Sequence, residues 1–165
     1  MARPVQLGTH SILIDASREL VFQMMTAFNS GRMPGEPNES SKVISRQGDE
    51  LVVEFKSRAG PVTYTSIEEV TLYPPERITF RHVSGPLHYA YDEFILEDPD
   101  GRTLLTHRGE IVWSKVPFFG RLGAVLYTRP MFNRVVTRHM EVIKTTSEAR
   151  AARSHVFRRR DQTPP

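Results

Sequence analysis

The sequence predicts an α+β fold in which a curved antiparallel sheet wraps round a long C-terminal helix. Two observations carry this prediction. Between Lys42 and Trp113 apolar and polar residues alternate with a period of two, and turn residues interrupt the alternation at intervals, as in an antiparallel meander. After Pro117 the apolar residues instead recur every three or four positions, which is typical of a helix that buries one face.

The chain of 165 residues has the length of one domain, and its composition, 39% hydrophobic and 25% charged, is that of an ordinary globular protein. We expect one folded domain over residues 1–154 and a basic, disordered tail over residues 155–165. The lack of cysteine excludes disulfides and thiolate chemistry. We expect a cytoplasmic protein that needs no cofactor.

The N-terminal segment predicts a strand followed by a short helix. Residues 5–16 alternate and end in a run of aliphatic residues, and Ser17 then offers an N-cap. The residues after this cap place apolar side chains on one face of a helix: Leu20, Val21, Met24, Met25 and Phe28. Residues 30–41 contain Pro34, Gly35 and Pro37, and they predict a loop or a broken helical turn.

Two turns set the expected register of the strands before Trp113. A three-residue turn, with Pro99–Asp100 as type I and Gly101 as a left-handed bulge, places Glu93 opposite His107. A four-residue turn at residues 84–87 pairs Phe80 with Tyr91, which places Tyr91 and Glu93 on the same face as the first turn does. If the last turn had two or four residues instead, the face assignment would reverse, because a slip of one residue turns every side chain over.

The last segment predicts a helix that is interrupted at Pro130, which lacks a backbone N–H. Its apolar stripe comprises Phe132, Val135, Val136, His139, Met140 and Ile143. The resulting order of strand, short helix, six-stranded meander and long helix is the helix-grip layout.

Several short motifs, in this order and spacing, resemble the START-like superfamily. They are the opening Ile14–Phe22, the turn Tyr73–Arg77, the hairpin Gly101–Thr103 and the segment Phe119–Leu122. More narrowly, the chain is similar to the polyketide cyclase/dehydrase and lipid-transport group. The resemblance covers residues 5–150 and implies a cavity between sheet and helix that binds a hydrophobic small molecule.

The side chains expected to line this cavity come from the inward face of the sheet and from the helix. They are Phe55, Tyr64, Phe80, His82, Tyr89, Tyr91, Glu93, Ile95, Leu105, His107, Ile111, Trp113, Met131, Val135 and His139. Among them Glu93 and His107 form a predicted carboxylate–imidazole pair. With Tyr91 this pair could act in acid–base catalysis. It could also be a satisfied cross-strand pair with no chemical role, or it could lie on the solvent face of the sheet.

Two functions therefore remain open at the level of the sequence. The first is a carrier or sensor of a lipid, polyketide or quinone-like molecule, and the alternative is a polyketide cyclase or dehydratase that uses Glu93, His107 and a tyrosine. We expect no metal site, because the histidines lack the short ligand spacings of zinc sites.

The positive charge of the chain is concentrated near its C-terminus. The formal charge is +3, and without Arg150, Arg153 and Arg158–Arg160 the rest of the chain carries about −2. This distribution argues against a nucleic-acid surface. A third hypothesis gives the arginine tail a transient contact with an anionic membrane. We expect a monomer or a homodimer.

Overall fold

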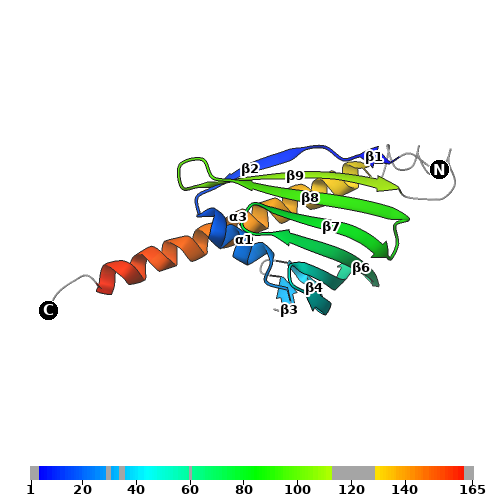
Figure 1. Ribbon diagram of the computed structural model, residues 1–165, viewed down its shortest axis with the longest axis horizontal. Helices are drawn as coiled ribbons and strands as arrows, with labels where there is room; N and C mark the ends of the chain where they lie inside the picture. The colour runs from blue at the N-terminus through cyan, green and yellow to red at the C-terminus, as the bar shows by residue number, and fades with distance from the viewer. Residues whose placement is uncertain (1–3, 29–30, 34–35, 60, 113–128, 162–165) are drawn as a thin grey trace.

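The computed structural model describes residues 4–28, 31–33, 36–59, 61–112 and 129–161, without the side chains of 31–33, 36–38, 59 and 155–161. Its described strands form one nine-stranded antiparallel sheet with the order β1-β9-β8-β7-β6-β5-β4-β3, and β2 pairs with β9 beside β1. The sheet curves round the long helix α3, as Figure 1 shows. This arrangement confirms the predicted helix-grip layout.

The N-terminal elements follow the expected order. β1 (Val5–Gln6) and β2 (His10–Ile14) share the predicted first strand, and α1 (Arg18–Met25) follows. Ser17 caps α1, because its hydroxyl accepts a hydrogen bond from the Leu20 backbone N–H at 3.4 Å.

The region after α1 differs from the prediction. The expected loop at residues 30–41 contains β3 (Gly31–Met33) and the first half of β4 (Glu36–Gln47), so that prediction was wrong. The two strands pair with each other, with a register shift between Arg32 and Met33. Proline and glycine in this segment therefore mark an irregular edge of the sheet.

The predicted meander is present as six consecutive strands. They are β4, β5 (Glu50–Ala59), β6 (Val62–Tyr73), β7 (Arg77–Ser84), β8 (Tyr89–Glu97) and β9 (Thr103–Val112). Each pairs with its sequence neighbour, so the sheet positions residues from distant segments on one concave face.

Helix α3 (Arg129–Asp161) packs its apolar stripe against this concave face. Pro130 occupies its first turn, where the missing N–H needs no intrahelical partner. The helix continues past residue 154 and projects beyond the sheet, and the domain boundary at that residue remains a prediction. Trp113 and the expected helical residues 117–128 lie outside the described part of the chain.

Three hydrogen bonds fix α3 to the N-terminal segment. Near its start, Asn133 Oδ1 accepts a bond from the Gly8 backbone N–H at 3.1 Å. Further along α3, Lys144 Nζ donates to the Leu13 carbonyl at 2.6 Å, and Glu148 accepts from the Asp15 N–H at 2.8 Å. No helix among the described residues is long and apolar enough to cross a membrane.

Candidate functional site

The inward face of β8 is the reverse of the predicted one. Observed cross-strand pairs are Phe94 with His107 and Glu93 with Arg108, whereas the sequence predicted Glu93 with His107. The predicted pair was therefore wrong by one residue. Because the side-chain period of a strand is two, this slip places Glu93 on the outer face of the sheet.

The slip originates in the turn between β8 and β9. Asp100 and Gly101 both have positive φ, 58° and 78°, and the Arg102 N–H donates to the Pro99 carbonyl at 3.3 Å. This is the geometry of a two-residue Asp-Gly hairpin turn rather than a three-residue turn with a bulge. The Asp98 carboxylate also accepts a bond from the Gly101 N–H at 2.7 Å.

The hairpin between β7 and β8 was displaced by one residue as well. Phe80 pairs with Asp92, where the prediction paired it with Tyr91. Both register errors shift β8 by one residue relative to its neighbours. The inward faces of β7 and β9 were therefore predicted correctly, and only the face of β8 was reversed. The agreement between the predicted turns was therefore no independent check on that strand.

The predicted cavity residues consequently divide into two groups. Those on the inward register positions of the sheet are Phe55, Tyr64, Phe80, His82, Leu105, His107 and Ile111. Those that lie on the outer face are Tyr89, Tyr91, Glu93 and Ile95. On the helix, Met131 and Val135 are exposed, and His139 bonds to Glu39 at 3.1 Å.

The residues that the sequence wrongly placed inside make their contacts on the outer face of the sheet. Arg77 bonds to Glu93 at 3.5 Å, and the Tyr89 hydroxyl donates to Glu110 at 2.8 Å. Desolvation, together with the Glu110 carboxylate, raises the pKa of Tyr89 to about 12. Tyr91 and Glu93 thus lie away from His107 and take no part in an interior site.

Four titratable side chains of β6 to β9 project from the inward face instead. We call Glu68, His82, Asp92 and His107 the internal polar cluster. Glu68 lies directly opposite His82, and Asp92 lies on the next strand, two positions from the residue opposite His107. The sheet therefore gathers two carboxyl groups and two imidazoles on the side that faces α3.

Asp92 and His107 form the best-defined contact of the cluster. Asp92 Oδ1 lies 2.8 Å from His107 Nε2, and the imidazole is 1% exposed. Gly109 is directly opposite Asp92, and a Cβ at Gly109 would lie 2.5 Å from Asp92 Oδ1. The missing side chain is thus the space in which the carboxylate reaches the histidine.

The contact with Asp92 also determines what His107 can do. A carboxylate accepts the proton of Nε2, which leaves Nδ1 of the neutral ring as a hydrogen-bond acceptor. His107 Nδ1 is buried and has no partner among the described residues. An unpartnered buried nitrogen beside a fixed carboxylate is suited to accepting a hydrogen bond or a proton from a bound molecule.

Glu68 titrates near neutrality. Burial raises the pKa of its carboxyl group from 4.5 to about 7, the Ser66 hydroxyl opposes this shift, and the Asp92 charge adds to it. Ser66 Oγ donates to Glu68 Oε1 at 3.0 Å. At neutral pH Glu68 therefore exists in both forms, and it can donate or accept a proton.

Further imidazole nitrogens in this region lack partners. The Nε2 atoms of His82 and His10 are buried without a hydrogen bond in the described structure, and His10 pairs with His107 across β2 and β9. The described residues contain no group of three or more His, Cys, Asp or Glu side chains that could hold a metal ion.

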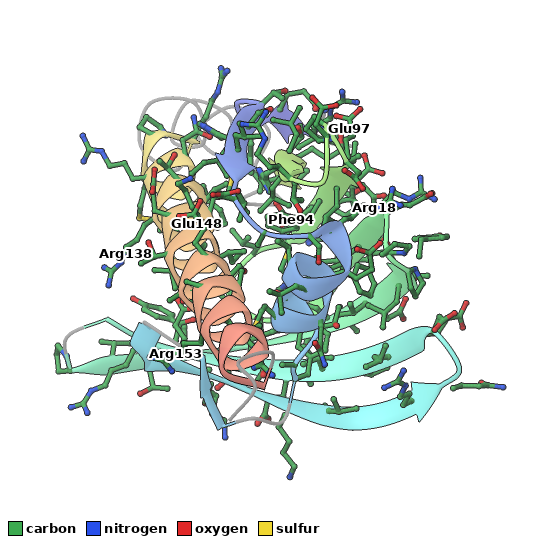
Figure 2. The ribbon with its side chains drawn as sticks, turned by 90° about the vertical axis from the view of Figure 1, so that its left-hand side faces the viewer. Arg18, Phe94, Glu97, Arg138, Glu148 and Arg153 are labelled. Carbon is green, nitrogen blue, oxygen red and sulfur yellow. The ribbon has the colours of Figure 1, made fainter. Side chains whose placement is uncertain are left out.

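Aromatic rings surround the cluster on its apolar side. Phe94 lies 4.8 Å from His107 between ring centroids, and a chain of edge-on or tilted contacts continues through Phe80 and Phe55 to Phe28. Figure 2 shows Phe94 between the sheet and the two helices, whereas Arg138 and Arg153 of α3 point outward. These rings place apolar surface directly beside the internal polar cluster.

One end of the inward face carries exposed apolar side chains. Tyr64 and Val62 of β6 are 47% and 46% exposed, although they occupy inward register positions. Tyr64 pairs with Ser57 and Ser57 pairs with Glu39, which bonds to His139 one turn after Val135. This row of residues is our candidate mouth of the interior.

A separate hollow of about 380 Å³ lies along α3. Its described lining residues are Asn133, Arg134, Thr137 and Arg138. Arg134, Thr137 and Arg138 are exposed and belong to the side of the helix away from Val136 and Met140, which pack on the sheet. This hollow is therefore distinct from the expected cavity.

Sequence reasoning missed Glu68 and Asp92. Glu68 has the same parity as Tyr64, Val70 and Leu72 in one strand, so this signal was available. Asp92 could have been found from the Asp100–Gly101 dipeptide, which favours a two-residue hairpin turn. No sequence pattern indicates that Gly109 leaves space for the Asp92 carboxylate, because this depends on how β8 and β9 are paired.

Comparisons with known proteins agree with this architecture. No family model and no curated protein matches the chain. Among solved structures, the protein TTHA0849 of Thermus thermophilus superposes with a TM-score of 0.68 at 16% identity, over 91% of this chain and 99% of that one. The Zhui aromatase/cyclase of Streptomyces sp. R1128 gives a TM-score of 0.67 at 18% identity, over 92% and 95%.

A START superfamily protein from Mycobacterium smegmatis is similar as well, with a TM-score of 0.63 at 16% identity over 90% of this chain and 99% of that one. At such identities these likenesses establish the fold. The chain has the helix-grip fold of these START-like structures, which is the fold that the resemblance of its sequence motifs implied.

Proposed function

We propose that the protein binds a hydrophobic small molecule between the concave face of the sheet and helix α3, as a carrier or sensor. The observation that carries this proposal is the unpartnered Nδ1 of buried His107, held beside Asp92 within an apolar interior. Small-molecule sites are mostly apolar and contain a few polar groups that fix the ligand's orientation.

The candidate mouth supports the same proposal. Apolar side chains at inward positions are normally buried, yet Tyr64 and Val62 are nearly half exposed. Bringing a ligand against these side chains would remove apolar surface from water, which stabilises a complex by about 25 cal/mol per Å². Lipids, polyketides and quinone-like molecules all offer such surface.

The binding experiment uses Nile red, an uncharged dye whose emission depends on its surroundings. We expect one dye molecule per chain. Ser66→Phe places a large side chain on the inward face of β6 and should weaken binding at least about tenfold, because it fills the proposed space. Thr65→Phe adds the same volume on the outer face of the same strand and should leave affinity unchanged.

Both variants must first be shown to keep the wild-type circular dichroism spectrum. Failure of Nile red to bind the wild-type protein, or equal effects of Ser66→Phe and Thr65→Phe, would contradict the proposal. Tyr91→Trp is a second control, since Tyr91 lies on the outer face.

A second candidate function is a cyclase or dehydratase, and the acid–base character of the cluster favours it. His107 Nδ1 could take a proton from a carbon next to a ketone and return it to the hydroxyl group that departs from the neighbouring carbon. A carbon–carbon double bond would form and water would leave. One of the structural neighbours is an aromatase/cyclase.

Dehydration of 4-hydroxy-4-phenylbutan-2-one tests this alternative, because the enone product absorbs in the ultraviolet. An enzyme should lose roughly a hundredfold or more in turnover when His107 is replaced by Gln. A carrier should show no turnover, and the same substitution should cost it about 0.5–1.5 kcal/mol of affinity.

A tail contact with anionic membranes and the choice between monomer and homodimer remain separate proposals. The described arginines near the end of α3 are exposed, as a membrane contact would require. Sedimentation of the protein with anionic vesicles, with and without residues 155–165, tests the membrane contact. Analytical ultracentrifugation tests the oligomeric state.

A further inference from the structure

We propose that the interior selects apolar ligands that carry an uncharged hydroxyl group and discriminates against ligands that carry a carboxylate. The inference rests on the proposed function and specifies the chemistry of the ligand's polar end. Three observations support it: the charged groups inside are mostly acidic, the unpartnered atoms include a hydrogen-bond acceptor, and aromatic rings lie beside these atoms.

The charged groups on the inward side are predominantly acidic. Glu39, Glu68 and Asp92 contribute three carboxyl groups to this side of the sheet. None of the lysines and arginines whose side chains are described is buried. The cations that accompany buried lipid carboxylates are thus missing from the described interior.

The histidines do not reverse this balance. His107 bonds to Asp92 and His139 bonds to Glu39, so each of these imidazoles already faces a carboxylate. His82 lies opposite Glu68, and His10 lies opposite His107. A ligand carboxylate in this space would meet fixed like charges at low dielectric, where repulsion is strongest.

The unpartnered atoms require a ligand that can donate a hydrogen bond. With Nε2 directed at Asp92, His107 Nδ1 is an acceptor, and a carboxylate has no proton to give it. A hydroxyl group donates to Nδ1 and can also accept from an imidazole N–H, such as one on His10 opposite His107. It therefore satisfies the interior donors and acceptors without adding charge.

The rings beside the cluster favour an aromatic or similarly flat alcohol. Phe94 is the nearest ring to His107, at 4.8 Å between centroids, and Phe80 lies 5.9 Å from Phe94. A ligand whose hydroxyl reaches His107 would have its apolar body against these rings, where offset or edge-on packing is favourable.

Three probes of one shape test the inference: naphthalene, 2-naphthol and 2-naphthoate, each measured by displacement of Nile red at pH 7.5. At this pH 2-naphthol is uncharged, as a phenol that ionises near pH 10. We expect 2-naphthol to bind at least about tenfold more tightly than 2-naphthoate, a difference of about 1.4 kcal/mol. Naphthalene should fall between them.

Two variants assign this selectivity to the interior. Glu68→Gln and Asp92→Asn each remove a negative charge and should bring the affinities of 2-naphthol and 2-naphthoate closer together. Glu97→Gln removes an exposed carboxyl from the same sheet and should leave their ratio unchanged.

Binding of 2-naphthoate as tight as that of 2-naphthol would overturn the inference while the proposed binding function stood. An unchanged ratio in both Glu68→Gln and Asp92→Asn would also overturn it. If Nile red itself failed to bind, the binding function would fail, and the inference with it.

Discussion

Asp92 reaches His107 across the place where Gly109 has no side chain. The carboxylate and the imidazole nitrogen are 2.8 Å apart, and a methyl group at Gly109 would occupy the carboxylate's position. One glycine thus makes possible the contact that fixes the tautomer of a buried histidine. The predictions begin from this relationship.

Replacing Gly109 by Ala should separate Asp92 from His107. The new Cβ would be 2.5 Å from Asp92 Oδ1, so the side chain must move. We expect a loss of about 1–3 kcal/mol in the free energy of unfolding, measured with urea. Arg108→Ala, at the exposed neighbouring position, is the control. Wild-type stability of Gly109→Ala would show that Asp92 moves away at no cost.

Replacing Glu68 by Gln should stabilise the protein at alkaline pH. Burial raises the pKa of Glu68 to about 7 in the folded state, above its value in the unfolded chain. Its stabilising contribution is therefore present below pH 4.5 and is lost as the pH rises through about 7. The advantage of Glu68→Gln should grow over this range to at most about 3 kcal/mol, at about 1.4 kcal/mol per pKa unit.

Thermal unfolding at a series of pH values measures this difference between wild type and Glu68→Gln. Glu97→Gln provides the matched exposed control. A constant difference from pH 4 to pH 8 would mean that Glu68 ionises in the folded protein as it does in the unfolded chain.

Replacing Glu148 by Gln should weaken the attachment of α3 to β2. The Asp15 N–H and Lys144 lower the pKa of Glu148, so its contribution is present above the unfolded pKa and is lost as pH falls through the folded pKa. We expect a loss of about 1 kcal/mol at pH 7 that disappears in acid. Denaturant curves at pH 7 and pH 3, with exposed Glu141→Gln as the control, measure it.

Removing residues 155–165 should change thermal stability little. The described side chains just before this segment, at positions 152–154, are exposed, and α3 projects beyond the sheet there. We expect the melting temperature to change by less than about 2 °C. A decrease of several degrees would show that the segment packs on the fold.

The sequence predicted the elements whose signals are local. Ser17 capped the first helix as expected, and strict alternation identified the strands of the meander. It did not predict the face of β8, because parity depends on turn length, and a turn containing Pro99, Asp100 and Gly101 is compatible with more than one length. A single error there exchanged Asp92 for Glu93 as the partner of His107.

Other parts of the site depended on long-range geometry. Glu68 acquires its raised pKa from burial and from Asp92 two strands away, which no local pattern encodes. The unpartnered state of His107 Nδ1 likewise follows from packing across β2, β8 and β9. The sequence did predict that His107 faces inward, because the inward face of β9 was predicted correctly.

The central claim is that a ligand meets the internal polar cluster, and nitrogen NMR of the histidine side chains tests it most directly. We predict that 2-naphthol shifts the His107 Nδ1 resonance as that atom accepts a hydrogen bond, while exposed His88, at the turn before β8, keeps its resonances. An unchanged His107 spectrum in protein saturated with 2-naphthol would contradict the account.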